Sequence, residues 1–192
     1  MKILLIDNNT KHRRHLLNDL AGHEVVELSY YPGVSFDWQD KDLIILSGGG
    51  GEGLEIRDTD RRGKLWYEDE MRLVRTCQKP IIGICMGFEV ICRAFGERVE
   101  EMADLVQGMT RLQVTPAGAA LFRRPHIRQL EAHRWRVRSV DADEFEVLAQ
   151  SSTGVEIIRH RRRPIVATQF HPEAPGGTLN LPALMQATLN LV

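Results

Sequence analysis

The segment Ile81-Ile82-Gly83-Ile84-Cys85-Met86-Gly87 joins a short apolar run to a stretch with helical spacing that continues to Phe95. Residues 81–84 predict a buried strand and residues 87–95 predict a helix, so Cys85 falls at the turn between the two elements. Glycines stand two residues before and two residues after the cysteine, and glycine allows neighbouring chain to come into close contact. The segment therefore predicts a sharp strand–turn–helix elbow that exposes the cysteine side chain above the edge of a sheet.

The same alternation of strand and helix extends toward the N-terminus. Apolar runs predict strands over residues 3–6, 25–28 and 43–46, and mixed polar and apolar spacing predicts helices over residues 11–20 and 65–77. Repeated strand–helix–strand units predict a parallel sheet that is covered by helices on both faces.

The pattern changes from about Arg98 onward, where short alternating segments predict antiparallel strands, either added to the sheet or packed beside it. These segments cover residues 109–115, 134–137, 145–150, 155–160 and 165–170. A final helix is predicted over residues 182–191. No internal repeat or linker interrupts the pattern, so we expect residues 1–192 to form a single α/β domain.

The composition excludes several classes of function. Of the 192 residues, 43 % are apolar and 27 % are charged, which fits a soluble protein with a sizeable core. The net charge of −1 creates no field toward nucleic acid, and no apolar run approaches the roughly 20 residues of a membrane span. The three cysteines form no metal-ligand spacing and leave an odd count for disulfides. We therefore expect a reduced, cytoplasmic setting and no metal or cofactor.

Cys85 is the first candidate catalytic residue. At the predicted elbow its sulfur lies near a helix N-terminus, where the helix dipole favours a thiolate. The backbone N–H of Met86 points the same way and could donate to a developing oxyanion. The alternative is a buried structural cysteine, because free cysteine is commonly buried. Cys77 and Cys92 lie within helical patterns without glycine neighbours, and we expect both to be structural.

His171 and Glu173 form the second candidate pair, two residues apart after the predicted strand 165–170. Side chains two residues apart on an extended chain point to the same face, and Pro172 favours that extended geometry. Glu173 can then accept a hydrogen bond from one imidazole nitrogen while the other nitrogen faces a nucleophile, as a general base requires. A solvated strand end would explain the pair alone. Strand ends far apart in sequence converge at the carboxyl edge of a sheet, however, which predicts a site shared with Cys85.

A glycine-rich stretch, Ser-Gly-Gly-Gly-Gly-Glu-Gly over residues 47–53, follows the predicted strand 43–46. Phosphate binding is disfavoured because the Lys-Ser/Thr ending of a P-loop is missing and no G-x-G-x-x-G motif opens a helix. The stretch could instead supply a backbone N–H donor that faces the thiol from an adjacent strand end. A flexible surface loop is the plain alternative.

Three motifs in this order resemble the class I glutamine amidotransferase family: Leu-Ser-Gly-Gly at residues 46–49, Gly-Ile-Cys-Met-Gly at residues 83–87 and Gln-Phe-His-Pro-Glu at residues 169–173. The similarity runs from Lys2 to the last predicted helix and is specific when the motifs are taken together. The resemblance implies a flavodoxin-like α/β sheet and a small-molecule substrate that carries a γ-glutamyl group.

The resemblance also implies roles for individual residues. Cys85 would be the nucleophile, His171 the base and Glu173 the residue that orients it. Gly49 and Met86 would supply the oxyanion amides. The reaction would pass through a γ-glutamyl thioester, release ammonia and end in hydrolysis to glutamate.

This sequence departs from the family at several positions. The family usually has proline where Gly50 stands, so the loop is expected to be looser. Glu89 replaces a glutamine that contacts the substrate, and it lies one helical turn beyond Cys85, so it should face the pocket. Its carboxylate lacks amide donors and repels a substrate carboxylate, and Gly-Phe-Glu at this place resembles γ-glutamyl hydrolases. Arg134 and Trp135 follow a segment whose backbone holds substrate groups in the family. Arg134 could pair with a carboxylate or could be an exposed strand residue.

Three functions follow from these features. The first is an amidotransferase subunit that passes ammonia to a synthetase on a separate chain, as the family implies. The second is a stand-alone γ-glutamyl hydrolase, favoured by Glu89. The third is a catalytically silent regulatory subunit, which the complete set Cys85, His171 and Glu173 argues against. The basic run at residues 159–163 is expected to be a solvated hairpin tip, with docking of an acidic partner as the alternative.

Overall fold

The computed structural model describes residues 1–49, 59 and 63–192 of the chain. Its helices and strands follow one another in the order β1 (Lys2–Asn8), α1 (Arg13–Asp19), β2 (Glu24–Ser29), β3 (Leu43–Gly49), α2 (Glu68–Thr76), β4 (Ile81–Ile84), α3 (Met86–Ala94), β5 (Val99–Val114), α4 (Pro116–Phe122), β6 (Ile127–Val137), β7 (Phe145–Gln150), β8 (Val155–His160), β9 (Ile165–Thr168) and α5 (Leu181–Leu189).

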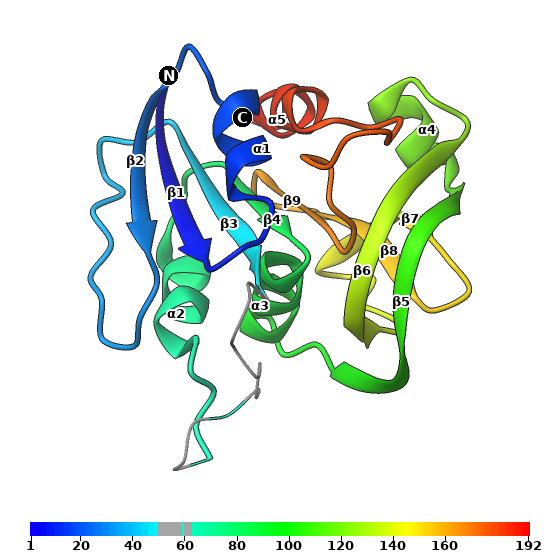
Figure 1. Cartoon of the computed structure of the whole chain (residues 1–192), viewed down its shortest axis with the longest axis horizontal. Helices are drawn as coiled ribbons and strands as arrows, with labels where there is room; N and C mark the ends of the chain where they lie inside the picture. The colour runs from blue at the N-terminus through cyan, green and yellow to red at the C-terminus, as the bar shows by residue number, and fades with distance from the viewer. Residues whose placement is uncertain (50–58, 60–62) are drawn as a thin grey trace.

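The strands form a curled sheet with the order β2-β1-β3-β4-β9-β8-β7-β5-β6 (Figure 1). The first five strands in this order are parallel, and β9 takes the fifth place of a flavodoxin-like 2-1-3-4-5 arrangement. Strands β8, β7, β5 and β6 continue the sheet in antiparallel fashion. The predicted α/β class is confirmed, and the antiparallel strands extend the parallel sheet rather than form a second layer.

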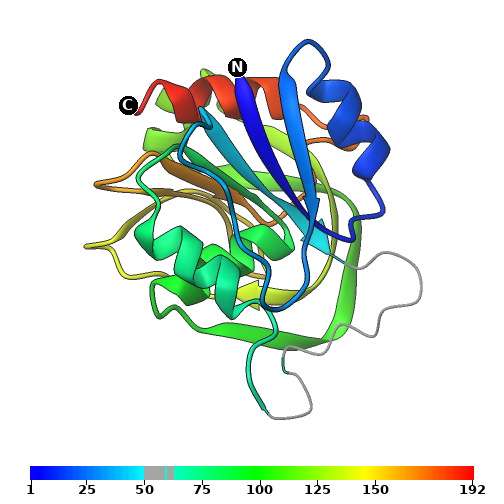
Figure 2. The same cartoon turned by 90° about the vertical axis from the view of Figure 1, so that its left-hand side faces the viewer.

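Helices cover both faces of the parallel half, with α2 and α3 on one side and α1 and α5 on the other (Figures 1 and 2). Because successive side chains of a strand point to opposite faces, a doubly covered strand is apolar at nearly every position. The first core cluster includes Leu4, Ile44, Leu73, Phe88 and Ile91, and the second includes Leu5, Ile45, Leu16, Leu184 and Met185. No helix in the described part of the chain has the length and apolar character that crossing a bilayer requires.

The glycines that flank Cys85 let helix α3 lie against the sheet. A Cβ atom on Gly87 would lie 2.3 Å from the carbonyl oxygen of Leu46 on the neighbouring strand β3. A Cβ atom on Gly83 would lie 2.6 Å from the carbonyl oxygen of Gly87. Real Cβ atoms do not approach backbone so closely, so both positions require glycine. The predicted elbow and its close backbone contacts are confirmed.

The structure differs from the sequence-based expectations mainly after residue 98. Strand β5 begins at Val99, ten residues earlier than predicted, because its solvated first half lacks a regular apolar pattern. Helix α4 was not predicted. It begins where the Thr115 hydroxyl accepts from the backbone N–H of Gly118 and Pro116 occupies the first turn. Strand β9 ends at Thr168, two residues before the predicted end.

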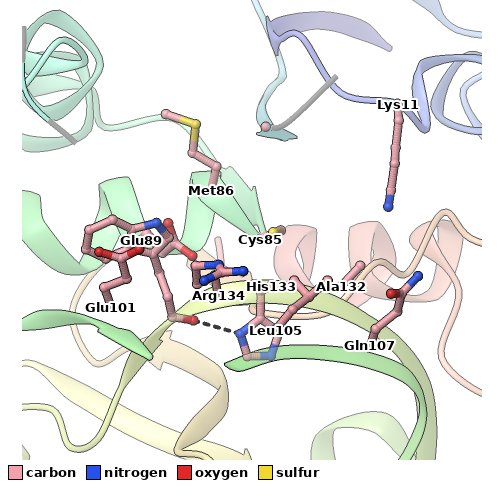
Figure 3. A pocket seen from close by; sticks show the side chains of 12 residues that line it. Lys11, Cys85, Met86, Glu89, Glu101, Leu105, Gln107, Ala132, His133 and Arg134 are labelled. Carbon is pink, nitrogen blue, oxygen red and sulfur yellow. Dashed lines mark hydrogen bonds between the residues drawn. The ribbon is translucent and has the colours of Figure 1, made fainter. Parts of the chain in front are cut away.

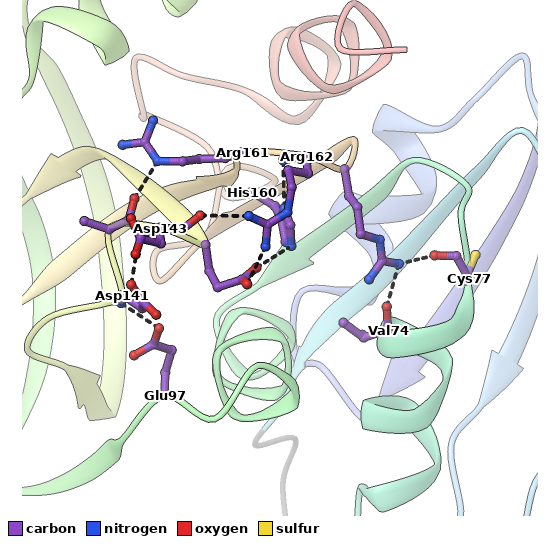
Figure 4. A network of polar contacts seen from close by, with 11 residues as sticks. Val74, Cys77, Glu97, Asp141, Asp143, His160, Arg161 and Arg162 are labelled. Carbon is purple, nitrogen blue, oxygen red and sulfur yellow. Dashed lines mark hydrogen bonds and ion pairs between the residues drawn. The ribbon is translucent and has the colours of Figure 1, made fainter.

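The basic run at residues 159–163 is held largely by contacts within the chain (Figure 4). Arg161 donates to the Ala142 carbonyl oxygen at 2.6 Å, and Arg162 pairs with Glu144. Arg163 donates to the carbonyl oxygens of Val74 and Cys77 at the end of α2. Arg161 and Arg162 remain exposed, as a solvated tip requires, while half-buried Arg163 ties the hairpin to the helical layer.

The close contact at Gly87 can be tested by a single substitution. In an ordinary helix, Gly→Ala stabilises a protein by roughly 0.5–1 kcal/mol. Because the new methyl group would meet the Leu46 carbonyl, we expect Gly87→Ala to lower the free energy of unfolding by about 1–3 kcal/mol instead. Urea denaturation of both proteins measures the difference. A stabilised variant would show that α3 does not depend on this contact.

Candidate active site

Cys85 lies at the end of β4 with a backbone conformation that few non-glycine residues adopt. Its φ is 51° and its ψ is −102°, and it is the residue that precedes helix α3. Its backbone N–H donates to the carbonyl oxygen of Thr168 on β9 at 2.7 Å, and its carbonyl accepts from Glu89. Strained backbone of this kind persists only when the surroundings hold it. The sheet and the helix together fix the direction of the thiol.

His171 and Glu173 are joined by a hydrogen bond, although the backbone between them is not the predicted extended chain. His171 Nδ1 lies 2.8 Å from Glu173 Oε1, and both side chains are buried. The backbone N–H of Ala174 donates to the His171 carbonyl at 3.1 Å, so residues 171–174 form a turn with Pro172 at its second position. The prediction that both side chains share a strand face was wrong. Proline stabilises a turn here, and the turn makes the contact.

The structure brings Cys85 and His171 to the same point at the carboxyl edge of the sheet. A Cβ atom placed on Gly48 would lie 3.5 Å from the Cβ of Cys85 and 2.9 Å from Cε1 of His171. Gly48 therefore lies between the two side chains, and any larger residue there would collide with the imidazole. Three strand ends, those of β3, β4 and β9, thus meet at one site, as the parallel order of the sheet leads one to expect.

The thiol of Cys85 is neutral in this environment. Burial raises the pKa of Cys85 well above its ordinary value, and the carboxylates of Glu89 and Glu173 raise it further. The backbone N–H of Met86 and the ammonium group of Lys11 act in the opposite direction but do not prevail. The expectation that the helix dipole favours a thiolate was wrong, because burial outweighs it. A base must take the proton if the sulfur is to react.

A pocket of about 340 Å³ opens beside Cys85 (Figure 3). Six of the residues singled out in the sequence line it: Gly49, Cys85, Met86, Glu89, Arg134 and Trp135. His171 and Glu173 do not line the pocket and lie buried beside the cysteine. Of the glycine-rich stretch, residues 47–49 are described, and Gly50 and the rest of that stretch lie outside the described residues.

Glu89 lines the pocket, as its position one turn beyond Cys85 predicted. Its Oε1 accepts a hydrogen bond from Nε2 of buried Gln169 at 2.9 Å. This contact was not predicted, and it joins the helix after the cysteine to the strand end before His171. Arg134, by contrast, is exposed and donates to the Ala103 carbonyl at 3.4 Å, so its side chain spans two strands at the pocket rim.

The loop between β1 and α1 adds two residues that the sequence did not single out. Lys11 lines the pocket and is the second cation there besides Arg134 (Figure 3). The ring of His12 packs against that of His171, with centroids 4.5 Å apart and planes tilted by 47°. Burial and the nearby His171 lower the pKa of His12 to about 4. No local pattern indicates that this loop reaches the site, so only its place after β1 at the shared sheet edge could have suggested it.

Comparison with known proteins places this fold and these motifs in one family. The model of the glutamine amidotransferase class-I family matches residues 4–187. Among solved structures, a candidate GMP synthase subunit from Thermoplasma acidophilum has a TM-score of 0.81 and 23 % identity and covers 100 % of this chain and 93 % of its own. A glutamine amidotransferase from Thermotoga maritima has a TM-score of 0.71 and 15 % identity, over 91 % of this chain and 76 % of its own.

Curated relatives have related names. A subunit of the glutamine-hydrolysing GMP synthase of Methanothermobacter thermautotrophicus is 31 % identical over 138 residues, which cover 70 % of this chain and 67 % of the relative. The arginine-specific carbamoyl phosphate synthase small chain of Hypocrea virens is 28 % identical over 79 % of this chain, and the match covers 31 % of that small chain. This chain thus spans less than a third of the length of that relative.

The contact of His12 with His171 predicts a dependence of stability on pH. Between pH 6.5 and pH 4 the unfolded chain binds a proton at His12 that the folded chain does not, so stability falls as the pH falls through this window. We expect His12→Phe, which keeps a ring but cannot titrate, to lose less unfolding free energy between pH 7 and pH 4.5 than the wild type. Thermal denaturation across this range measures the difference.

His23→Phe serves as the matched control, because His23 lies in the turn before β2. It should behave as the wild type does. An identical pH dependence of the wild type and His12→Phe would contradict the burial of a neutral His12 at the site.

Proposed function

Because this chain belongs to the class-I glutamine amidotransferase family, whose model matches residues 4–187, we propose that it hydrolyses glutamine to glutamate and ammonia with Cys85 as the nucleophile. The observation that carries the proposal is the meeting of Cys85 and His171 on either side of Gly48. A thiol with a raised pKa needs an adjacent base, and the imidazole is the base that lies nearest in the described fold.

The reaction begins with transfer of the thiol proton to His171. Glu173 accepts a hydrogen bond from Nδ1–H, which leaves the lone pair of Nε2 available for that proton and stabilises the imidazolium that forms. The sulfur attacks the side-chain amide carbon of glutamine. His171 then returns the proton to the departing nitrogen, ammonia leaves, and a γ-glutamyl thioester remains on Cys85. Water, deprotonated by His171, attacks the thioester and releases glutamate and the thiol.

Backbone amides would hold the negative charge that develops on the amide oxygen. We assign this role to the N–H groups of Met86 and Gly49, which belong to the first turn of α3 and to the end of β3. Both residues line the pocket beside Cys85. Donors fixed by a helix N-terminus and a strand end need little reorganisation when the tetrahedral intermediate forms.

The rest of the pocket would bind the amino acid part of the substrate. We assign Glu89 to the substrate ammonium and Arg134 to the carboxylate, with Trp135 as an apolar wall. Residues 1–192 would act as one domain in a cytoplasmic setting. The ammonia would pass to a synthetase on a separate chain, by analogy with the relatives named as a synthase small chain and a synthase subunit.

A stand-alone γ-glutamyl hydrolase is the second candidate, and Glu89 is the observation that favours it. A carboxylate at this position cannot donate to the substrate carboxylate, whereas a glutamine side chain could. The hydrogen bond from Gln169 satisfies part of the Glu89 carboxylate and holds it at the pocket. The two candidates share the same nucleophile and differ in the leaving group, which is ammonia in one and an amino acid or peptide in the other.

Replacement of the nucleophile tests the proposal directly. We expect Cys85→Ala to lower the rate of ammonia release from glutamine by at least about a thousandfold, because no other group can form the thioester. Cys92→Ala is the matched control, since Cys92 is buried in the same helix away from the pocket. Activity near that of the wild type in Cys85→Ala, or no activity in the wild type with or without a co-purified synthetase, would contradict the proposal.

Substitution of Glu89 separates the two candidates. For an amidotransferase, Glu89→Gln should raise kcat/KM for glutamine, because the repulsion of the substrate carboxylate is removed, and should leave γ-glutamyl dipeptides poor substrates. For a hydrolase, the wild type should prefer γ-glutamyl dipeptides and Glu89→Gln should weaken that preference. Side-by-side kinetics with glutamine and one dipeptide decide between them. Unchanged kinetics in Glu89→Gln would show that Glu89 does not reach the substrate.

A further inference from the structure

Three ionisable side chains meet behind the wall of the pocket. Glu131 and His133 lie two residues apart on the buried side of β6, and Glu156 reaches them from β8. Strands β6 and β8 are not neighbours in the sheet and face each other across its curl. One oxygen or nitrogen from each side chain lies within 4.8 Å of the other two, and this is the one such group among the residues that the structure describes.

The polar atoms of this group are buried without hydrogen-bond partners. Both carboxylate oxygens of Glu131, Oε2 of Glu156 and Nε2 of His133 have none within the described chain. Glu131 is 0 % exposed and Glu156 is 1 % exposed, so water does not solvate either group. A buried carboxylate without donors costs several kcal/mol. The nearest compensation is the imidazole, whose Nε2 lies 3.5 Å from Glu131 Oε2.

A second set of contacts orients these side chains toward their common centre. His133 Nδ1 lies 2.7 Å from the carbonyl oxygen of Trp135, so this nitrogen carries the proton and Nε2 presents its lone pair to the carboxylates. Ser151 and Thr153 donate to Oε1 of Glu156 at 2.7 and 3.3 Å, which leaves Oε2 for another partner. Metal-binding histidines are held in this way by a backbone carbonyl at the second nitrogen, and metal-binding carboxylates by hydroxyl donors.

We propose that Glu131, His133 and Glu156 bind a divalent transition-metal ion, with Zn²⁺ as the expected ion. Two carboxylates and one neutral imidazole balance a charge of +2 and supply the nitrogen and oxygen donors that Zn²⁺ accepts. Tetrahedral Zn²⁺ places its donor atoms about 3.4 Å apart. The 3.5 Å contact between Glu131 and His133 fits this spacing, and Glu156 closes the rest by a small side-chain movement.

The pocket provides access to this site. His133 lines the pocket as well as the buried group, so an ion and its fourth ligand, a water molecule, can enter from the pocket side. The bound ion would join β6 to β8 and stiffen the pocket wall formed by Ala132, Arg134 and Trp135. Its role is structural, and the hydrolysis of glutamine does not require it for any chemical step.

Metal binding to the purified full chain, free of any affinity tag, tests this proposal without a measurement of activity. After removal of metal with a chelator, the protein is titrated with Co²⁺ and Zn²⁺, with stoichiometry measured by equilibrium dialysis and Co²⁺ followed by its visible absorption. We expect one equivalent of either ion per chain and a higher Tm with Zn²⁺. The same result is expected in Cys85→Ala, which excludes binding by the pocket thiol.

Variants locate the ion. Glu156→Gln and Glu131→Gln should each weaken binding by more than about tenfold, since even partners of metal ligands contribute 10–100-fold. Glu144→Gln is the matched control, because Glu144 faces His160 with a 3.2 Å separation and that pair lies outside the group. Its binding should equal that of the wild type. Absence of stoichiometric binding to the wild type, or equal binding by folded Glu156→Gln, would overturn the proposal.

Discussion

The close approach of helix α3 to strand β3 is the constraint on which the site depends. Gly87 contacts the Leu46 carbonyl and Gly83 contacts the backbone of Gly87, so the helix starts directly above the sheet. Only this arrangement lets Cys85 occupy its strained conformation and direct its sulfur toward the end of β3. The short distance also requires glycine at position 48, where the His171 ring fills the space that a side chain would need.

Burial and reactivity are balanced against each other at this site. The surroundings that hold Cys85 also raise its pKa, so the resting thiol is protected and inert. The proposed base, His171, lies between Glu173, which accepts its Nδ1–H, and the neutral ring of His12. A neutral neighbour does not oppose the positive charge that His171 would acquire. Reactivity would therefore arise only when a substrate lies in the pocket and the proton can move.

Much of the fold followed from the sequence, because doubly covered strands are apolar throughout and the glycines around Cys85 mark the elbow. The solvated half of β5 could not be predicted, because residues 99–108 alternate irregularly and are mostly exposed or half-buried. Seven-residue α4 was too short to show a period. The buried group Glu131, His133 and Glu156 was missed for a different reason: charged residues are normally exposed, and nothing local shows that β6 curls over β8.

The site itself was anticipated where strand ends supply it and missed where a loop does. Cys85, His171 and Glu173 follow the strands β4 and β9, so a parallel sheet alone brings them near one another. Lys11 and His12 come from a loop whose path depends on tertiary packing. The turn at Pro172 shows that a contact can be predicted correctly from the wrong backbone geometry.

The central claim is that His171 activates Cys85 and no other cysteine. Site-resolved mass spectrometry after treatment with a glutamine-like electrophile tests it most directly, with the wild type and His171→Ala compared at neutral pH. The account predicts that the label appears on Cys85 alone, and that its rate falls steeply in His171→Ala. Labelling of Cys77 or Cys92 in preference, or an unchanged rate in His171→Ala, would contradict it.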